Sequence, residues 1–247
     1  MKNALISILL AVSCIVYGQS MTMGGPVLVT PNLTEVGGDS LLAFYRFETN
    51  LDDEQDNYDG TAEGTLTYSS STVKEGSNSL IIDAFNDASN IGTVDFTSEF
   101  TISIWHYYNN SSNSGALVLF SNRSSTANDD GFAIWLNSWA TTDGRILVYT
   151  GDGTEQDNAY SATGVYNSSQ WNHICIRYNG SGDWDFWINN SDETVDGTTQ
   201  DDFATSGETT MIGNYTSLNY SGDGNYDKVQ IFDKALTDSE ISTLYNE

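Results

Sequence analysis

Short segments in which apolar and polar residues alternate recur from Leu41 to the C-terminus, and this pattern limits the fold more than any other feature. There are about eleven of them, for example FTISIWHYY, GFAIWLN and RILVYTG, and each spans roughly four to nine residues. Dipeptides that favour tight turns, such as DG, GS, SG and NN, separate the segments. Because a period of two places apolar side chains on one face of a strand, the pattern predicts an all-β domain of antiparallel strands.

The strands of residues 40–247 follow one another without a linker or a repeat period. A single domain of this kind buries its apolar faces as two packed sheets, so we expect a two-sheet antiparallel sandwich. The last segment, LTDSEISTLYN, departs from the alternation and predicts a short C-terminal helix. Thr237 can cap this helix, and Glu240 completes a capping-box pattern.

The N-terminus has the composition of a secretory signal. Lys2 precedes an apolar run, ALISILLAVSCIVY, that is shorter than the about twenty residues that a membrane span requires. We therefore interpret residues 1–19 as a signal peptide, and expect a secreted protein, extracellular or at the cell surface, without a membrane span. The alternative is a lipoprotein anchored at Cys14, since AVSC resembles a lipobox. The apolar run continues beyond Cys14, which favours cleavage of the signal instead.

Residues 20–39 contain both prolines of the chain and predict an arm or linker before the folded domain. The arm includes an apolar stretch, PVLVT, which could add a strand to the sheet edge of a second copy or of a partner protein. This stretch supports the alternative that the protein is a structural component of an extracellular filament or virion and acts through protein–protein contacts.

The charge balance excludes two classes of partner. The chain has 34 acidic residues against 8 Lys and Arg, which gives a formal net charge of −26. Binding to nucleic acid or to anionic lipid needs basic residues, so neither is expected. Cations, neutral sugars and basic partners remain open.

Cysteine and histidine offer no convincing catalytic group. Once the signal is cleaved, Cys175 is the only cysteine, so no disulfide forms within the chain. Its place in the alternating segment HICIRY predicts a buried apolar role. His106 and His173 each flank a tryptophan-bearing strand, and neither has a Ser or Cys partner at a suggestive spacing. We expect both to be hydrogen-bonded strand residues.

The stretch DDEQDNYDG permits three interpretations. Glu54, Asp56 and Asp59 copy the spacing of glucanase carboxylates, but a catalytic strand needs apolar residues on its buried face, and only Tyr58 provides one. A cation such as Ca²⁺ prefers oxygen ligands in a flexible loop, which the acids and amides of this stretch can supply. The third interpretation is a solvated acidic turn. We favour the calcium site and do not expect an enzyme.

Five stretches in chain order share the features of one family. They are LLAFYRFETNLDDEQDNYDGTAEG, GSNSLIID, FTISIWHYY, WNHICIRYNGSGDWDFWINN and YDKVQIFDKALTDSEISTLYN. Together they resemble the laminin-G-like, concanavalin-A-like jelly-roll family, although Asn190 stands where that family usually has Gly. The resemblance implies a jelly-roll domain over residues 40–247. The family includes lectins, carbohydrate-binding modules, adhesion domains and virion components, so the fold alone does not decide the function.

The resemblance also implies where calcium would bind. In this family a Ca²⁺ often joins the first loop to an acid at the start of the last strand. Asp53 matches the loop acid, and Asp227 matches the strand acid. Asp56 and Asp59 share the loop and Glu48 lies near it, so these five residues are the expected ligands of a structural calcium. Such a metal would stabilise a domain that has no disulfide.

A sugar site needs aromatic faces beside a few polar groups. In GFAIWLN, Trp135 and Asn137 share the strand face opposite to Phe132. With Trp139 and Tyr160 they could line a groove that binds a polysaccharide or the glycan of a glycoprotein; the alternative is that they pack within the sandwich. Our leading hypothesis is thus a secreted, non-enzymatic, lectin-like carbohydrate-binding or adhesion domain. Assembly through the arm is the second hypothesis, and a glycoside hydrolase is the third.

Overall fold

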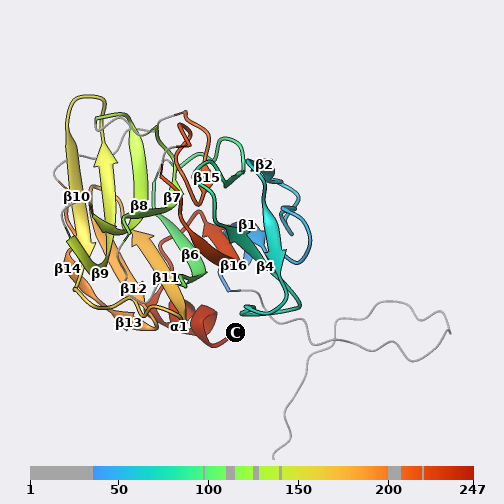
Figure 1. Ribbon diagram of the computed structural model, residues 1–247. Helices are drawn as coiled ribbons and strands as arrows, with labels where there is room; N and C mark the ends of the chain where they lie inside the picture. The colour runs from blue at the N-terminus through green and yellow to red at the C-terminus, as the bar shows by residue number, and fades with distance from the viewer. Residues whose placement is uncertain are drawn as a thin grey trace, which may run out of the picture. The chain divides into compact units, whose positions relative to one another are not determined.

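The computed structural model describes residues 36–96, 98–109, 115–124, 128–138, 141–199, 207–218 and 220–247. The described residues form two antiparallel sheets of eight strands each, a 3₁₀ helix, η1 (Gly38–Ser40), and an α-helix, α1 (Asp238–Asn246). Figure 1 shows the sheets as two layers, with α1 at the C-terminal end of the chain. The predicted two-sheet antiparallel sandwich with a short C-terminal helix is confirmed.

The first sheet has the strand order β13-β12-β11-β6-β16-β4-β3, and β1 also pairs with β16. Its strands are β1 (Leu41–Tyr45), β3 (Thr67–Ser69), β4 (Ser79–Ile82), β6 (Phe100–Tyr107), β11 (Trp171–Tyr178), β12 (Trp184–Ile188), β13 (Ser191–Asp192) and β16 (Gly224–Phe232). The second sheet has the order β14-β10-β9-β8-β7-β15-β5-β2. Its strands are β2 (Thr61–Glu63), β5 (Ala88–Asn90), β7 (Leu117–Ser121), β8 (Gly131–Ser138), β9 (Thr141–Gly151), β10 (Gln156–Ser161), β14 (Thr194–Asp196) and β15 (Met211–Ile212).

The inner faces of the two sheets form one core, and the alternation in the sequence decides which side chains enter it. Phe100 and Ile102 of β6 and Phe132 and Ile134 of β8 are at most 2% exposed and belong to this core. The rings of Phe100 and Phe132 stack with centroids 5.1 Å apart. Burial of each such side chain contributes about 1.5–3 kcal/mol, so this core joins the two layers.

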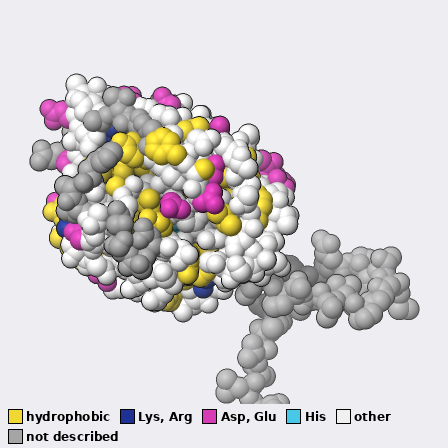
Figure 2. Space-filling view, viewed as in Figure 1, with side chains coloured by type: hydrophobic (Ala, Val, Ile, Leu, Met, Phe, Trp, Pro, Cys, Tyr) yellow, Lys and Arg dark blue, Asp and Glu magenta, His cyan; other side chains and the backbone are white. Residues whose placement is uncertain are grey.

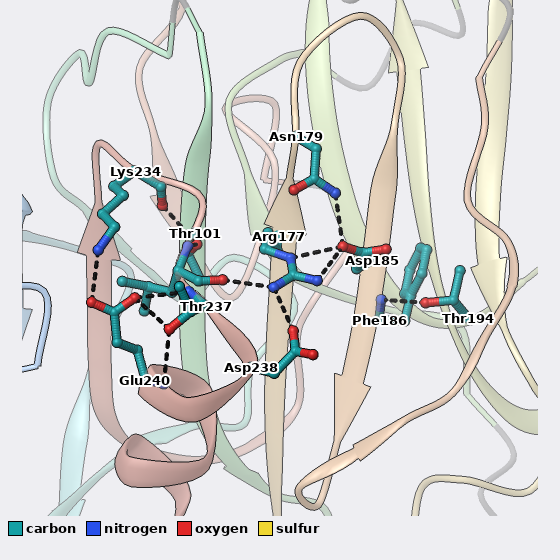
Figure 3. Close-up of polar contacts among 11 residues, drawn as sticks. Thr101, Arg177, Asn179, Asp185, Phe186, Thr194, Lys234, Thr237, Asp238 and Glu240 are labelled. Atoms are coloured by element: carbon teal, nitrogen blue, oxygen red, sulfur yellow. Dashed lines mark hydrogen bonds and ion pairs between the residues drawn. The ribbon is translucent and has the colours of Figure 1, made fainter.

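Helix α1 is tied to the first sheet by its cap and by one arginine. The predicted capping box is confirmed, since the Thr237 hydroxyl accepts from the Glu240 N–H and the Glu240 carboxylate accepts from the Thr237 N–H. Arg177 of β11 pairs with Asp185 at 2.6 Å and with Asp238 at 2.9 Å (Figure 3). It also donates to the backbone carbonyl just before the helix cap at 2.7 Å. Because the guanidinium donors form a planar fork, one side chain holds the start of α1 against β11 and β12.

Two of the residues considered for chemistry are buried near this helix. Cys175 is fully buried and packs in one apolar cluster with Ile241 and Leu244 of α1. Burial raises the pKa of its thiol to about 12, so the predicted apolar role is confirmed. His173 lies 2.8 Å from the hydroxyl of Ser103 through Nε2. Its predicted place as a hydrogen-bonded strand residue is confirmed as well.

The N-terminal segment, residues 1–35, lies outside the described residues. The signal peptide at 1–19, the lipoprotein alternative at Cys14 and the arm at 20–39 therefore remain predictions. Only the last four residues of the arm are described: Val36 is buried in one cluster with Leu244 of α1, and Gly38 and Asp39 belong to η1. Within the described part of the chain, no helix is long and apolar enough to cross a membrane.

Candidate functional site

The acidic loop DDEQDNYDG is organised around the carboxylate of Asp53, which is 1% exposed. Its Oδ1 accepts from the backbone N–H of Phe44 at 2.7 Å and of Gln55 at 3.1 Å. Its Oδ2 accepts from Asn57 and Tyr58, both at 3.1 Å. A carboxylate offers about four lone-pair sites, and four N–H donors occupy them. These bonds fold the loop back onto β1 and leave no oxygen of Asp53 for a metal ion.

The other predicted metal ligands have different hydrogen-bond partners or are exposed. Asp59 lies beside Asp53 and accepts its backbone N–H at 2.9 Å, whereas Asp56 is exposed in a left-handed conformation with φ of 57°. Glu48 and Asp227 each accept N–H groups from the segment that precedes β4. Among the described residues, no three acidic, histidine or cysteine side chains gather into a possible metal site. Asp53, with its four N–H donors, is thus not available as a ligand in this arrangement, and the calcium remains a prediction from the sequence.

Two of the aromatic residues expected in a groove, Trp135 and Tyr160, lie on the outer face of the second sheet, where other side chains pack on them. Trp135 is 3% exposed. Its indole N–H donates to the Tyr215 hydroxyl at 3.1 Å, and the Tyr220 ring lies 5.2 Å from it, centroid to centroid. Tyr160 is half-buried, and the guanidinium of Arg145 stands 5.1 Å from its ring centre. A sugar could stack on Trp135 only after displacement of the two tyrosines.

Asn137 is buried and has a structural task. Its amide donates to a backbone carbonyl just before β7 at 2.7 Å and accepts from a backbone N–H of β9 at 2.8 Å. Its φ of 63° belongs to the irregular end of the β8–β9 pairing. Trp139 lies outside the described residues. The structure thus brings Trp135 and Tyr160 to one face and places Asn137 inside the protein.

A pocket of about 410 Å³ opens at one end of the first sheet. The ends of β4 and β6 and the start of β16 lie side by side there, since Asn225 pairs with Ile81 on one side and with Tyr107 on the other. Two carboxylates, two amides, two isoleucines and a tyrosine line the pocket, together with Gly224: Asp83, Asp223, Asn109, Asn225, Ile81, Ile82 and Tyr108.

A buried histidine holds the backbone behind this pocket. His106 Nε2 lies 3.3 Å from the carbonyl oxygens of Gly222 and Asp223, and Nδ1 lies 2.9 Å from the Tyr166 hydroxyl. Since carbonyls only accept, Nε2 carries the hydrogen and Nδ1 accepts from Tyr166. Burial lowers the pKa of His106 to about 4, which keeps the ring neutral. The predicted place of His106 as a hydrogen-bonded strand residue is confirmed. Gly224 permits this approach, because a Cβ there would stand 2.5 Å from Nε2.

The electrostatics of the pocket are acidic. Burial, together with the charge of Asp83, raises the pKa of Asp223. No lysine or arginine is found among the described residues that line the pocket. Figure 2 shows a surface that carries many acidic side chains and few basic ones on the face in view. The pocket therefore suits a neutral or cationic ligand and repels an anionic one.

Three residues of this pocket, Asp83, Asn109 and Asn225, could not be singled out from the sequence. The available signal was weak: polar residues stand directly at the ends of the apolar stretches SLIID and FTISIWHYYNN and before YDKVQIF. Which strand ends meet depends on the order β6-β16-β4 in the sheet. That order differs from the order along the chain.

A model of the concanavalin A-like lectin/glucanases superfamily matches residues 83–242. The match covers more than half of the chain, and the protein belongs to this superfamily. A search of curated proteins finds no match.

Solved structures share the fold at low sequence identity. Domain 4 of AbnA, a GH43 extracellular arabinanase from Geobacillus stearothermophilus, in complex with arabinotriose, is 20% identical with a TM-score of 0.64, and the alignment covers 83% of this chain and 98% of that one. The binding domain of Paraclostridial Mosquitocidal Protein 1 is 18% identical with a TM-score of 0.66, over 84% and 52% of the two chains. The receptor binding domain of botulinum neurotoxin C/D mosaic serotype is 14% identical with a TM-score of 0.62, over 84% and 51%. This chain spans about half the length of the two toxin structures.

Proposed function

We propose that this protein is a secreted, non-enzymatic carbohydrate-binding domain whose sugar site is the pocket at the end of β4, β6 and β16. The observation that carries the proposal is the lining: two carboxylates and two amides converge beside a tyrosine in one hollow. Sugar hydroxyls both donate and accept hydrogen bonds. Asp83 and Asp223 can accept from them, and the amides of Asn109 and Asn225 can do both.

The superfamily and its structural neighbours support this class of function. A domain with the same fold was solved with arabinotriose bound, which motivates a sugar as ligand without specifying which one. The candidate catalytic acids of the sequence, Glu54, Asp56 and Asp59, lie in a loop and not on a strand, and none of them lines the pocket. Neither the expected calcium nor the arm takes part in the proposal.

Binding to a panel of immobilised polysaccharides and glycoproteins, followed by calorimetry with the best ligand, tests the proposal. Asp223→Asn should weaken binding about tenfold or more, because a charge-assisted hydrogen bond contributes about 1.5–3 kcal/mol. Asp39→Asn is the matched control. Asp39 is exposed in η1, which directly precedes β1. Leu41 of β1 pairs with Phe232, and this end of β16 lies about 25 Å along the strand from the pocket. Absence of binding to every neutral glycan would overturn the proposal, and release of reducing ends from a bound polysaccharide would overturn its non-enzymatic part.

A further inference from the structure

Phe85 is the only aromatic residue in the described part of the chain whose side chain is largely exposed. It is 65% exposed, and the one other large hydrophobic residue in this class is Val195 at 62%. A single exposed apolar side chain is common on protein surfaces. Two further observations make the exposure of Phe85 significant: the turn that carries the ring is rigidly held, and it directly follows residues that line the pocket.

The turn that carries Phe85 is fixed by a buried acid. Asp87 is 1% exposed, and its carboxylate accepts from the backbone N–H of Ala84 at 3.1 Å and of Thr65 at 2.9 Å. The N–H of Asp87 donates to the Ala84 carbonyl at 3.0 Å and closes the turn. The carboxylate of Asp87 therefore faces inward, whereas the phenyl ring of Phe85 is exposed.

A fully buried amide holds the same turn from the other side. Asn214 donates to the carbonyl of Phe85 at 3.0 Å and to that of Asp87 at 3.2 Å. Its side-chain oxygen accepts from the backbone N–H groups of Tyr215 and Tyr220, both at 2.9 Å. Because the backbone at Phe85 is already ordered, little conformational entropy is lost when a ligand contacts the ring.

The residue that carries this ring closely follows the pocket lining along the chain. Phe85 follows the pocket-lining Asp83 by two residues, so their Cα atoms are at most about 7 Å apart. The turn begins where β4 ends at Ile82, which is also in the pocket lining. A residue with an exposed apolar ring therefore lies two positions from the lining of a pocket that holds two carboxylates and two amides. This arrangement can contact both the C–H face and the hydroxyls of one sugar.

We infer that Phe85 is a stacking platform that extends this pocket, and that the ligand is an uncharged sugar ring with one face of C–H groups. The inference rests on the proposed carbohydrate-binding function and adds a residue and a ligand class to it. The C–H face of the sugar ring packs on the phenyl ring of Phe85, while neighbouring sugar hydroxyls donate to Asp83 and Asp223. An acidic sugar is excluded because both carboxylates would repel it and no described basic side chain lines the pocket.

The test is affinity electrophoresis of the protein in gels that contain arabinan, a mixed-linkage β-glucan, galactomannan or polygalacturonate, followed by calorimetry with the matching oligosaccharide. Phe85→Ala should weaken binding to a neutral polysaccharide roughly tenfold, and Phe85→Trp should retain it. Val195→Ala is the matched control: an equally exposed apolar side chain, on β14 of the other sheet, whose loss should leave affinity unchanged. Since the Phe85 side chain is exposed, its variants should unfold at the wild-type temperature within about 2 °C.

The outcomes separate this inference from the proposed function. If Asp223→Asn loses affinity while Phe85→Ala binds like wild type, the platform is refuted and the sugar site stands. If polygalacturonate binds better than every neutral polysaccharide, the ligand class is refuted. If none of the four polysaccharides and no glycan of the wider panel binds, the proposed function falls, and the inference falls with it.

Discussion

The Asp53→Asn substitution tests whether hydrogen bonds hold the acidic loop against β1. It keeps the size of the side chain and replaces one acceptor oxygen by an NH₂ donor. Each oxygen of Asp53 accepts two backbone N–H groups. Whichever way the new amide turns, two N–H groups therefore lose their acceptor and face a donor. Hydrogen bonds to a charged group contribute about 1.5–3 kcal/mol each, so the free energy of unfolding should fall by about 3–6 kcal/mol.

Thermal unfolding followed by circular dichroism measures this loss. In a domain of this size about 1 kcal/mol corresponds to a change of roughly 2–4 °C in Tm, so Tm should fall by at least about 6 °C. Asp56→Asn is the matched control, because it removes the same charge from the same loop at an exposed position. Asn also tolerates the left-handed backbone of residue 56. This variant should stay within about 0.5 kcal/mol of wild type.

Calcium distinguishes the hydrogen-bond explanation from the metal site expected from the sequence. Both variants and the wild type are melted with excess Ca²⁺ and again with a chelator. If N–H donors hold Asp53, the wild-type Tm is the same in both conditions, and the deficit of Asp53→Asn is the same too. If the wild-type Tm falls on chelation and the Tm of Asp53→Asn does not change with calcium, the carboxylate is a metal ligand and the reasoning is refuted. An Asp53→Asn variant as stable as Asp56→Asn would refute it as well.

Three further predictions concern stability, and urea denaturation measures each of them. Thr237→Ala removes the N-cap of α1 and should cost about 1 kcal/mol. Arg177→Lys keeps the charge but cannot reach two carboxylates and a carbonyl at once, so it should lower the free energy of unfolding by about 1–3 kcal/mol. Acidification should also destabilise the fold: burial lowers the pKa of His106 to about 4 and of His173 to about 3, so below about pH 6.5 the unfolded chain binds more protons. Burial raises the pKa of Asp227 to about 6, so protonation of this group stabilises the folded state as the pH falls from about 6 to 4. The free energy of unfolding should therefore fall by less than the two histidines alone would give. Unchanged stability down to pH 4 would contradict this prediction.

Features that depend on neighbouring residues were predictable from the sequence. The alternation in GFAIWLN places Phe132 in the core and Trp135 on the opposite face, and both positions are confirmed. The pattern Thr237–Glu240 predicted the capping box, and HICIRY predicted the burial of Cys175. Strand period and helix caps are properties of a few consecutive residues, so the chain shows them without any knowledge of what packs against them.

The candidate site depends on contacts that no local pattern contains. Tyr215, which covers Trp135, lies 80 positions further along the chain, and Asp227 accepts a hydrogen bond from Lys74 across 153 positions. The acids of DDEQDNYDG could suit a metal by composition, but β1 brings the N–H of Phe44 to Asp53 and so decides how that carboxylate is used.

The sequence by itself determined an all-β sandwich, its inward and outward faces, its final helix and a net negative charge that disfavours anionic partners. Periodicity and net charge are properties of the sequence and need no knowledge of the contacts. Only the tertiary structure decided which polar groups meet. In the sheet, β16 lies between β6 and β4, and this order brings Asp223 to the same pocket as Asp83 and Asn109. Strand order in a sandwich is set by the pairing and packing of whole strands, so side chains distant in sequence become neighbours only when the sheets have formed.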